Sequence, residues 1–196
     1  EALAVKIDKK AAVTLVTASQ TSGTIGGSAI QADGTEVNND VIDSGLTPKA
    51  KGDALIEAIF AAVAAMEAKD VTGEKYFVTT PLIYSYLAQS SAINKDVTSG
   101  TNGGLDTGKV MVVAGIKIYK SNNLPTATAI DVGGVNKKLK GLIFSSDAIG
   151  VVKLMDVTSE ANYIPEQLAT LLTSYYSYGM GVLKPSCSCV ITGGNV

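Results

Sequence analysis

The chain has 196 residues, of which 46% are hydrophobic and 17% charged, and its formal net charge is -2. All sixteen basic residues are lysine, and the sequence contains no arginine, histidine or tryptophan. The absence of histidine excludes Ser-His and Cys-His catalysis and histidine-based metal sites. The absence of arginine and of net positive charge argues against a protein that grips nucleic acid. The charged fraction lies below the roughly 25% of an average soluble domain, which indicates a large core or a surface that meets other protein.

The first 45 residues predict a helix followed by a polar loop. Residues 1–19 place apolar side chains at a spacing of four, which is typical of an amphipathic helix. The chain begins without methionine in the middle of this pattern, so we expect a further N-terminal segment. Residues 20–45 are rich in glycine and polar side chains and predict a loop with at most a short strand. Its carboxylates lack the spacing of a calcium loop, and we expect them to be solvated: Asp33, Glu36, Asp40 and Asp43.

Helices and strands alternate in the next segment. Thr47 and Pro48 are the cap and first residue of a predicted long helix, whose apolar stripe is widened by Phe60, so that most of its sides should be covered. "EKYFVTT" predicts a strand, and the pair Thr80 and Pro81 predicts the start of another helix.

The stretch "GGLDTGKV", residues 103–110, resembles a phosphate-binding P-loop, but Val110 replaces the hydroxyl residue that would hold magnesium. A working P-loop follows a hydrophobic strand and opens a helix. This stretch follows a polar loop and precedes a predicted strand. The sequence therefore favours a glycine-rich turn with Lys109 at its solvated end.

The second half of the chain predicts mainly strands. Ile116 and Ile118 alternate with polar neighbours, and β-branched residues dominate the stretches that follow. The tail is ambiguous by period, but its glycines and tyrosines favour strands, and the tyrosine cluster at 175–178 suggests core or protein interface rather than base stacking. Cys187 and Cys189 fit a half-buried strand as small apolar residues. Helices early and strands late indicate the α+β class.

The order of these segments resembles the major capsid proteins of tailed bacteriophages. The similarity is carried by the ordered series "GDALIEAIFAAVAAM", "YFVTTPLIYSYLAQ", "VAGIKIYKSNNLP", "GLIFSSDAIGVVKLMDV" and "YGMGVLKPSCSCVI". Within that family the short-tailed, T-seven-like podoviruses are the most similar. The resemblance covers most of the chain and implies the Hong Kong ninety-seven phage capsid fold, without the N-terminal arm, the extended loop and part of the spine helix.

The resemblance also implies a domain layout. Residues 1–45 would belong to the peripheral domain as the second half of the spine helix and its following loop, and residues 46–147 would form the axial domain, a mixed sheet flanked by helices. Residues 148–184 would return to the peripheral domain, and residues 185–196 would be a last strand that rejoins the axial domain.

The function implied is that of a structural subunit of an icosahedral head, forming hexamers and pentamers around double-stranded DNA that it does not bind sequence-specifically. Its partners would be further copies of itself, a scaffolding protein during assembly and a portal at one vertex, with no membrane, no metal, no cofactor and no catalytic residue. It would be found in the virion capsid after assembly in the host cytoplasm. Candidate subunit contacts lie in the glycine-rich loop and the strand after it: Gly100, Asn102, Gly103, Gly104, Asp106, Lys109, Lys117 and Lys120.

Three alternatives remain open at this stage. An encapsulin-like bacterial compartment shell would share the fold and hold cargo enzyme instead of DNA. A small α/β nucleotide-binding enzyme would use the loop from Gly103 to Lys109. An adhesin or tail component would share the glycine-rich loops but form fibres or small oligomers.

Overall fold

The computed structural model describes residues 2–21, 33–44, 47–91, 112–125, 129–132 and 135–195. The longer helices are α1 (Ala2–Ser19), α3 (Pro48–Glu67) and α4 (Pro81–Ala88), with a single turn at α2 (Val41–Ser44). The strands are β1 (Thr35–Asn38), β2 (Lys75–Thr79), β3 (Val112–Val113), β4 (Ile116–Lys120), β5 (Ala129–Val132), β6 (Val135–Ser145), β7 (Ile149–Ile164), β8 (Ala169–Val182) and β9 (Ser188–Asn195). Short 3-10 turns η1 (Pro165–Gln167) and η2 (Pro185–Cys187) precede β8 and β9. This mixture confirms the predicted α+β class.

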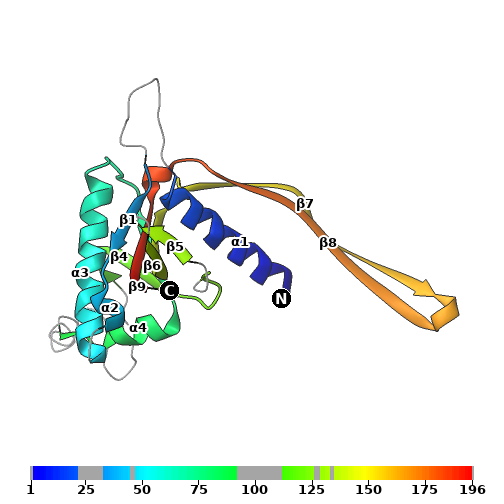
Figure 1. Cartoon of the computed structure of the whole chain (residues 1–196). Coiled ribbons are helices and arrows are strands. Elements are labelled where there is room, and N and C mark those ends of the chain that lie inside the picture. The colour runs from blue at the N-terminus through cyan, green and yellow to red at the C-terminus, as the bar shows by residue number, and fades with distance from the viewer. Residues whose placement is uncertain are drawn as a thin grey trace.

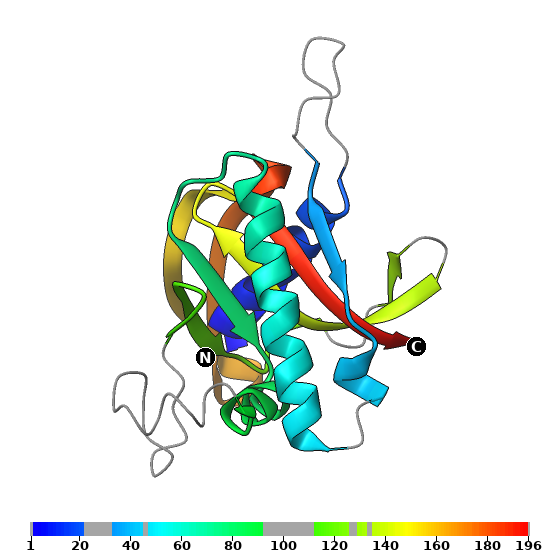
Figure 2. The same cartoon turned by 90° about the vertical axis from the view of Figure 1, so that its left-hand side faces the viewer.

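Among the described residues, seven strands form one mixed sheet. The order is β1-β9-β6-β2-β4-β3, and β5 pairs with β6 beside this path. β1 runs parallel to β9 and β2 parallel to β4, whereas β6 is antiparallel to both β2 and β9. Figures 1 and 2 show α3 against one face of the sheet and α1 on the opposite side. The seven-stranded sheet therefore lies between two helices, with α4 near one end of α3, and we call this part of the molecule the body.

The two capped helices begin where the sequence predicts. The Thr47 hydroxyl accepts a hydrogen bond from the Ala50 backbone N–H at 3.2 Å, and Pro48 occupies the first turn. Thr80 caps α4 in the same way. These caps satisfy backbone donors that the first helical turn would otherwise leave unpaired.

The core joins the sheet to α3 and, through Leu15 and Val16, to α1. The α3 residues Leu55, Ile59 and Met66 have no exposed surface, and Phe77 of β2 is likewise fully buried. The prediction that α3 is covered on most sides is wrong for Phe60, which is 56% exposed. Neighbouring elements contact only part of the helix circumference, because α2, α4, β1 and β9 all pack on the side that faces the body.

The first polar segment is more structured than expected, because it contains β1 and α2. The expectation that its carboxylates are merely solvated is wrong for two of them. Lys137 Nζ lies 2.7 Å from Asp40 Oδ1, and Lys140 Nζ lies 2.5 Å from Asp43 Oδ1. Both lysine side chains are about nine-tenths buried, so these two carboxylates neutralise buried ammonium groups and tie residues 40–43 to β6.

Strands β7 and β8 leave the body as a long antiparallel ribbon. Their pairing runs from Ile149 opposite Val182 to Ile164 opposite Ala169, with register shifts between Lys153 and Thr158. Figure 1 shows the ribbon extending past the N-terminal end of α1. Helix α1 contacts both ribbon strands, and Lys10 Nζ lies 4.9 Å from the centre of the Tyr178 ring. The predicted strands of this region are thus present, but much of their length lies outside the sheet.

Candidate subunit interfaces

Most residues of the predicted contact loop lie outside the described part of the chain. This holds for Gly100, Asn102, Gly103, Gly104, Asp106 and Lys109. The P-loop-like stretch therefore stays a sequence-based interpretation. The next described element is the two-residue strand β3 at the edge of the sheet, paired with β4.

The two remaining predicted contact residues, Lys117 and Lys120, both lie on β4 but on different faces. Lys117 Nζ is 3.3 Å from Glu74 Oε2 and 5.9 Å from the centre of the Tyr76 ring. Lys120 Nζ lies 5.4 Å from the ring of Tyr84 on α4. Because side chains alternate along a strand, positions three apart point to opposite sides. The structure therefore does not bring these two lysines into one patch.

Lys117 belongs to a small exposed network with Glu74 and Tyr76. The Tyr76 hydroxyl donates to Glu74 Oε2 at 2.8 Å. This hydrogen bond, together with the ammonium of Lys117, lowers the pKa of Glu74, and the bond to Glu74 raises the pKa of Lys117. Both groups stay ionised at neutral pH. The network can orient a polar contact, but it supplies neither a neutral amine nor a protonated acid for catalysis.

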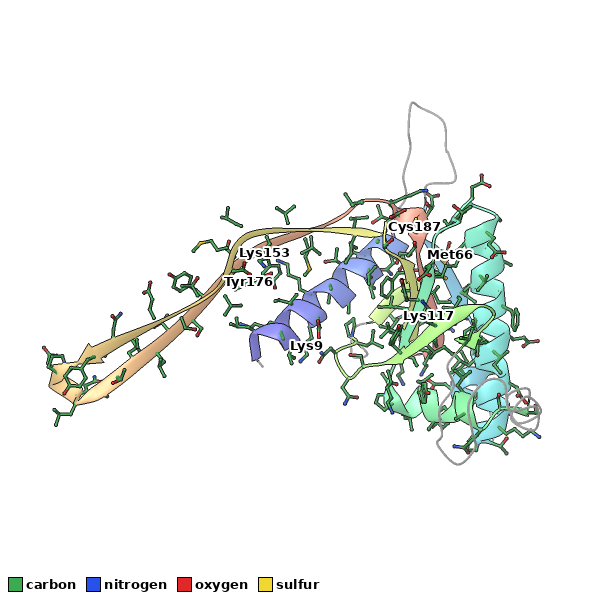
Figure 3. All side chains as sticks on the ribbon, turned by 180° about the vertical axis from the view of Figure 1, so that it is seen from behind. Lys9, Met66, Lys117, Lys153, Tyr176 and Cys187 are labelled. Carbon is green, nitrogen blue, oxygen red and sulfur yellow. The ribbon has the colours of Figure 1, made fainter. Side chains whose placement is uncertain are left out.

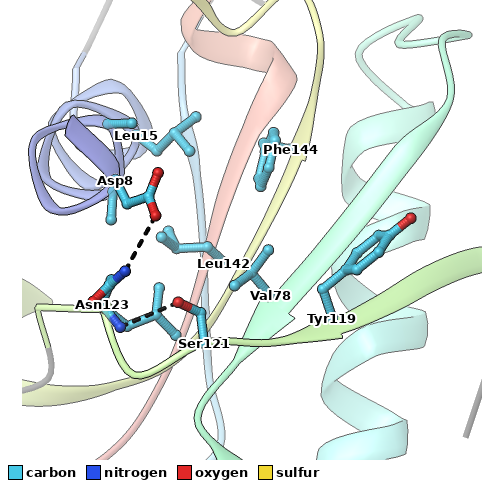
Figure 4. A pocket seen from close by; sticks show the side chains of 11 residues that line it. Asp8, Leu15, Val78, Tyr119, Ser121, Asn123, Leu142 and Phe144 are labelled. Carbon is cyan, nitrogen blue, oxygen red and sulfur yellow. Dashed lines mark hydrogen bonds between the residues drawn. The ribbon is translucent and has the colours of Figure 1, made fainter. Parts of the chain in front are cut away.

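A groove of about 270 Å³ separates α1 from the sheet face that carries Tyr119 (Figure 4). Most of its lining is apolar, from Leu15, Val78, Leu142 and Phe144. The polar residues at one side of the groove form hydrogen bonds with one another. Asn123 Nδ2 donates to Asp8 Oδ2 at 3.2 Å, and the Asn123 backbone N–H donates to Ser121 Oγ at 3.1 Å.

Candidate chemical groups elsewhere are sparse. Within the described residues no three histidine, cysteine, aspartate or glutamate side chains come together to hold a metal ion. Cys187 and Cys189 are buried free thiols, and burial raises the pKa of Cys189 to about 12. The Cys189 thiol is therefore protonated at neutral pH and unsuited to act as a nucleophile. This agrees with its predicted role as a small apolar residue, although Cys187 lies in η2 rather than in the strand.

Most of the exposed large apolar side chains that the structure describes lie on the ribbon. Its exposed large side chains are Val151, Val152, Leu154, Met155, Val157, Tyr163, Leu168, Leu171, Leu172 and Tyr175. Figure 3 shows ribbon side chains projecting from both faces. A two-stranded hairpin is marginally stable alone in water, and an apolar surface of this extent marks an interaction site. The ribbon is thus a candidate interface.

Sequence reasoning missed this interface, and the unusual length of its two strands is the feature that sets it apart. The strands have 16 and 14 residues, whereas strands of globular domains usually have about five or six. Two strands of this length extend beyond the seven-stranded sheet and its helices, because most strands that cover a core are only a few residues long. Exposure itself could not be deduced, since apolar residues in a strand normally indicate burial.

No described helix combines the length and the apolar character that a membrane span requires.

Comparison with known proteins identifies capsid relatives. A family model described as Gp10A-like major capsid protein matches residues 1–192. A solved capsid structure of the cyanophage P-SCSP1u is 28% identical, with a TM-score of 0.79, and the match covers 100% of this chain and 63% of that chain. The chain thus spans less than two thirds of the length of that protein. No curated protein sequence matches it.

Two further solved structures are similar in fold alone. The mature capsid of bacteriophage PhiM1 is 16% identical, with a TM-score of 0.76, and the match covers 98% of this chain and 61% of that chain. The structure of Mycobacterium phage Che8 is 20% identical, with a TM-score of 0.66, and the match covers 97% of this chain and 59% of that chain. These similarities confirm the phage capsid fold that the ordered segments imply, while the similarity to T-seven-like podoviruses in particular stays a prediction.

Proposed function

Because the chain belongs to the Gp10A-like major capsid protein family, we propose that it is a structural subunit of an icosahedral bacteriophage head. Copies would form hexamers and pentamers that enclose double-stranded DNA. The virion capsid is then its location, and assembly would take place in the host cytoplasm. This role requires no catalytic residue and no cofactor.

The observation that supports this proposal best is the uncovered ribbon. Leu154, Leu168 and Leu172 are 79%, 83% and 74% exposed, and each leucine buried at a contact contributes about 1.5–3 kcal/mol relative to exposure. If this apolar surface becomes buried only on contact with neighbouring subunits, its burial stabilises the assembled shell relative to the free subunit. A chain with 17% charged residues fits this role, since the buried cores of interfaces are depleted in charge.

We propose the domain layout stated from the sequence. Helix α1 and the ribbon would belong to the peripheral domain, and their direct contacts support placing them together. Residues 46–147 would form the axial domain, which β9 rejoins. One strand from residues 1–45, β1, pairs in parallel with β9, so the N-terminal segment also contributes to the sheet.

Further partners are proposed on the same basis. A scaffolding protein would guide closure of the shell, and a portal would occupy one vertex. Contact with packaged DNA would be independent of sequence, in keeping with a net charge of -2 and no arginine.

Assembly of the full-length protein tests this function. The protein would be produced with and without its scaffolding partner and imaged by negative-stain electron microscopy. Closed shells of uniform size are expected. Small monodisperse particles from a folded full-length chain with scaffold present would contradict the proposal, and cargo enzyme in place of DNA would indicate a bacterial compartment instead.

The loop from Gly100 to Lys109 is the proposed site of further subunit contacts, and Lys117 and Lys120, on opposite faces of β4, are proposed as two separate contacts. Replacing Gly103 and Gly104 together by valine should reduce the yield of closed shells while circular dichroism of the subunit stays unchanged. Normal shells from this variant would remove the loop from the contacts. Binding of ATP by the original chain that is lost in Lys109→Ala would instead revive the nucleotide-binding alternative.

A further inference from the structure

The distal half of the ribbon is both apolar and acidic. From residue 157 to residue 183 its only charged residues are Glu160 and Glu166, and both are exposed. The preceding acid, Asp156, already forms an ion pair with Lys153. The Tyr175 hydroxyl donates to Glu160 Oε1 at 2.9 Å, which holds this carboxylate on the ribbon surface.

The strand register shows which apolar side chains share a face with Glu160. Directly opposed residues in an antiparallel pair point to the same side, and so do residues two apart. Glu160 opposes Thr173, Asn162 opposes Leu171, and Thr158 opposes Tyr175. Leu171 and Tyr175 therefore lie on the Glu160 face. We call this surface, with Glu166 and Leu168 at the adjoining turn, the acidic ribbon face.

A basic surface of matching character lies on α1. Lys6, Lys9 and Lys10 are exposed, and among the described residues no carboxylate oxygen lies within 4.0 Å of their ammonium groups. Asp8 is turned to the other side, where it accepts from Asn123. Val13 is 49% exposed and lies one turn further along the helix from Lys9 and Lys10. We call these three lysines and Val13 the basic helix surface.

These two surfaces cannot meet within one chain. Lys10 of α1 lies over Tyr178 at the proximal part of the ribbon, and Tyr178 opposes Lys153. Glu160 is seven residues beyond Lys153, a distance of about 23 Å at about 3.3 Å per strand residue. Glu166 is further still. Such separations exceed the screening length of about 8 Å at physiological ionic strength, so within the described residues of one copy the acidic ribbon face and the basic helix surface do not pair with each other.

We propose that the acidic ribbon face of one copy docks on the basic helix surface of a second copy. Glu160 and Glu166 would face the lysines, and Leu168 and Leu171 would pack against Val13 and the lysine methylene groups. The carboxylates of one surface are opposite in charge to the ammonium groups of the other, and both surfaces expose apolar side chains. A second copy of this chain therefore provides a partner for each surface. The contact is heterologous, because one copy gives the ribbon and the other the helix, and it can continue from subunit to subunit. This inference rests on the proposed shell function.

Charge exchange provides the test, with shell assembly of the full-length protein and its scaffold as the readout. Lys9→Glu with Lys10→Glu, and separately Glu160→Lys with Glu166→Lys, should each lower the fraction of subunits in closed shells by about tenfold or more, because like charges are then opposed. Combining all four substitutions should restore assembly to within about threefold of the original level. Lys49→Glu with Lys138→Glu is the charge-matched control, since both lysines are exposed on other elements.

The possible results separate this proposal from the shell function itself. Failure of the unaltered protein to form shells would refute the shell function. Normal shells from either double variant, or no recovery in the fourfold variant despite a folded subunit by circular dichroism, would overturn the proposed contact. Normal shells that lose only packaged DNA in the Lys9 and Lys10 variant would overturn it as well, since they would identify a nucleic-acid surface.

Discussion

Gly141→Ala would place a methyl group inside the centre of the sheet. A Cβ at this position would overlap Cε2 of Phe77 and lie 2.6 Å from its Cζ, whereas carbon atoms in contact are usually about 3.5–4.0 Å apart. Phe77 is fully buried, and Gly141 pairs with Thr79 on one side and Ile191 on the other. Neither the ring nor the strand can move away freely. Overpacking of this kind costs about 1–3 kcal/mol, so we expect the free energy of unfolding to fall by about 2 kcal/mol, a factor of roughly 30 in the folding equilibrium.

Phe77→Leu is the matched second change, because leucine lacks the two ring atoms that meet the new methyl group. Alone, Phe77→Leu should lower the free energy of unfolding by about 1–2 kcal/mol, because it removes three buried carbons and leaves a small cavity. In the Phe77→Leu background, Gly141→Ala should lower the free energy of unfolding only slightly. The interaction free energy between the two sites is then about 1.5–2 kcal/mol. Urea unfolding of the original chain, both single variants and the double variant measures this coupling. Additivity within about 0.5 kcal/mol would refute the packing argument.

Two further predictions concern ionisation. The hydrogen bond from Lys137 lowers the pKa of Asp40 below its ordinary value of 3.8, so its stabilising effect is present above the unfolded-state pKa and is lost as pH falls through the lower folded-state pKa. Urea midpoints taken from about pH 5 down to about pH 2.5 should therefore fall more steeply for the original chain than for Asp40→Asn, and parallel curves would contradict this. Both cysteines are buried, which blocks access of a reagent, and burial also raises the pKa of Cys189 to about 12. Iodoacetamide at about pH 8 should therefore label neither cysteine in the folded chain and both in urea. Mass spectrometry would show labelling without denaturant if the thiols were accessible.

Local features were predicted well from the sequence because their causes are local. Thr47 and Thr80 precede prolines, and a threonine followed by a proline favours a capped helix start through contacts within the first turn. The alternation at 116–119 likewise predicts one buried face, and Ile116 and Ile118 are buried as expected. The ordered segments also carried the family resemblance, which the match over residues 1–192 confirms.

Pairings between distant residues could not be predicted in this way. The residues next to Asp40 in the sequence are those of an ordinary polar loop and do not predict an ion pair. The ion pair forms because β6 places Lys137, 97 residues further along the chain, beside Asp40. The sequence predicts at most a short strand in this loop and no partner for it, and in the structure β1 pairs with β9, with Thr35 opposite Cys189. Such contacts depend on which strands become neighbours, and strand order has no local signal.

The sequence by itself determined the helices, the strand-rich second half and the family, because capping, alternation and segment order are properties of neighbouring residues. Tertiary structure decided what is exposed. Leucine is a residue type that usually lies in a core, but the ribbon carries Leu168 and Leu172 beyond any described element that could cover them. Burial depends on the whole chain, and in this protein we propose that it depends on a second copy as well.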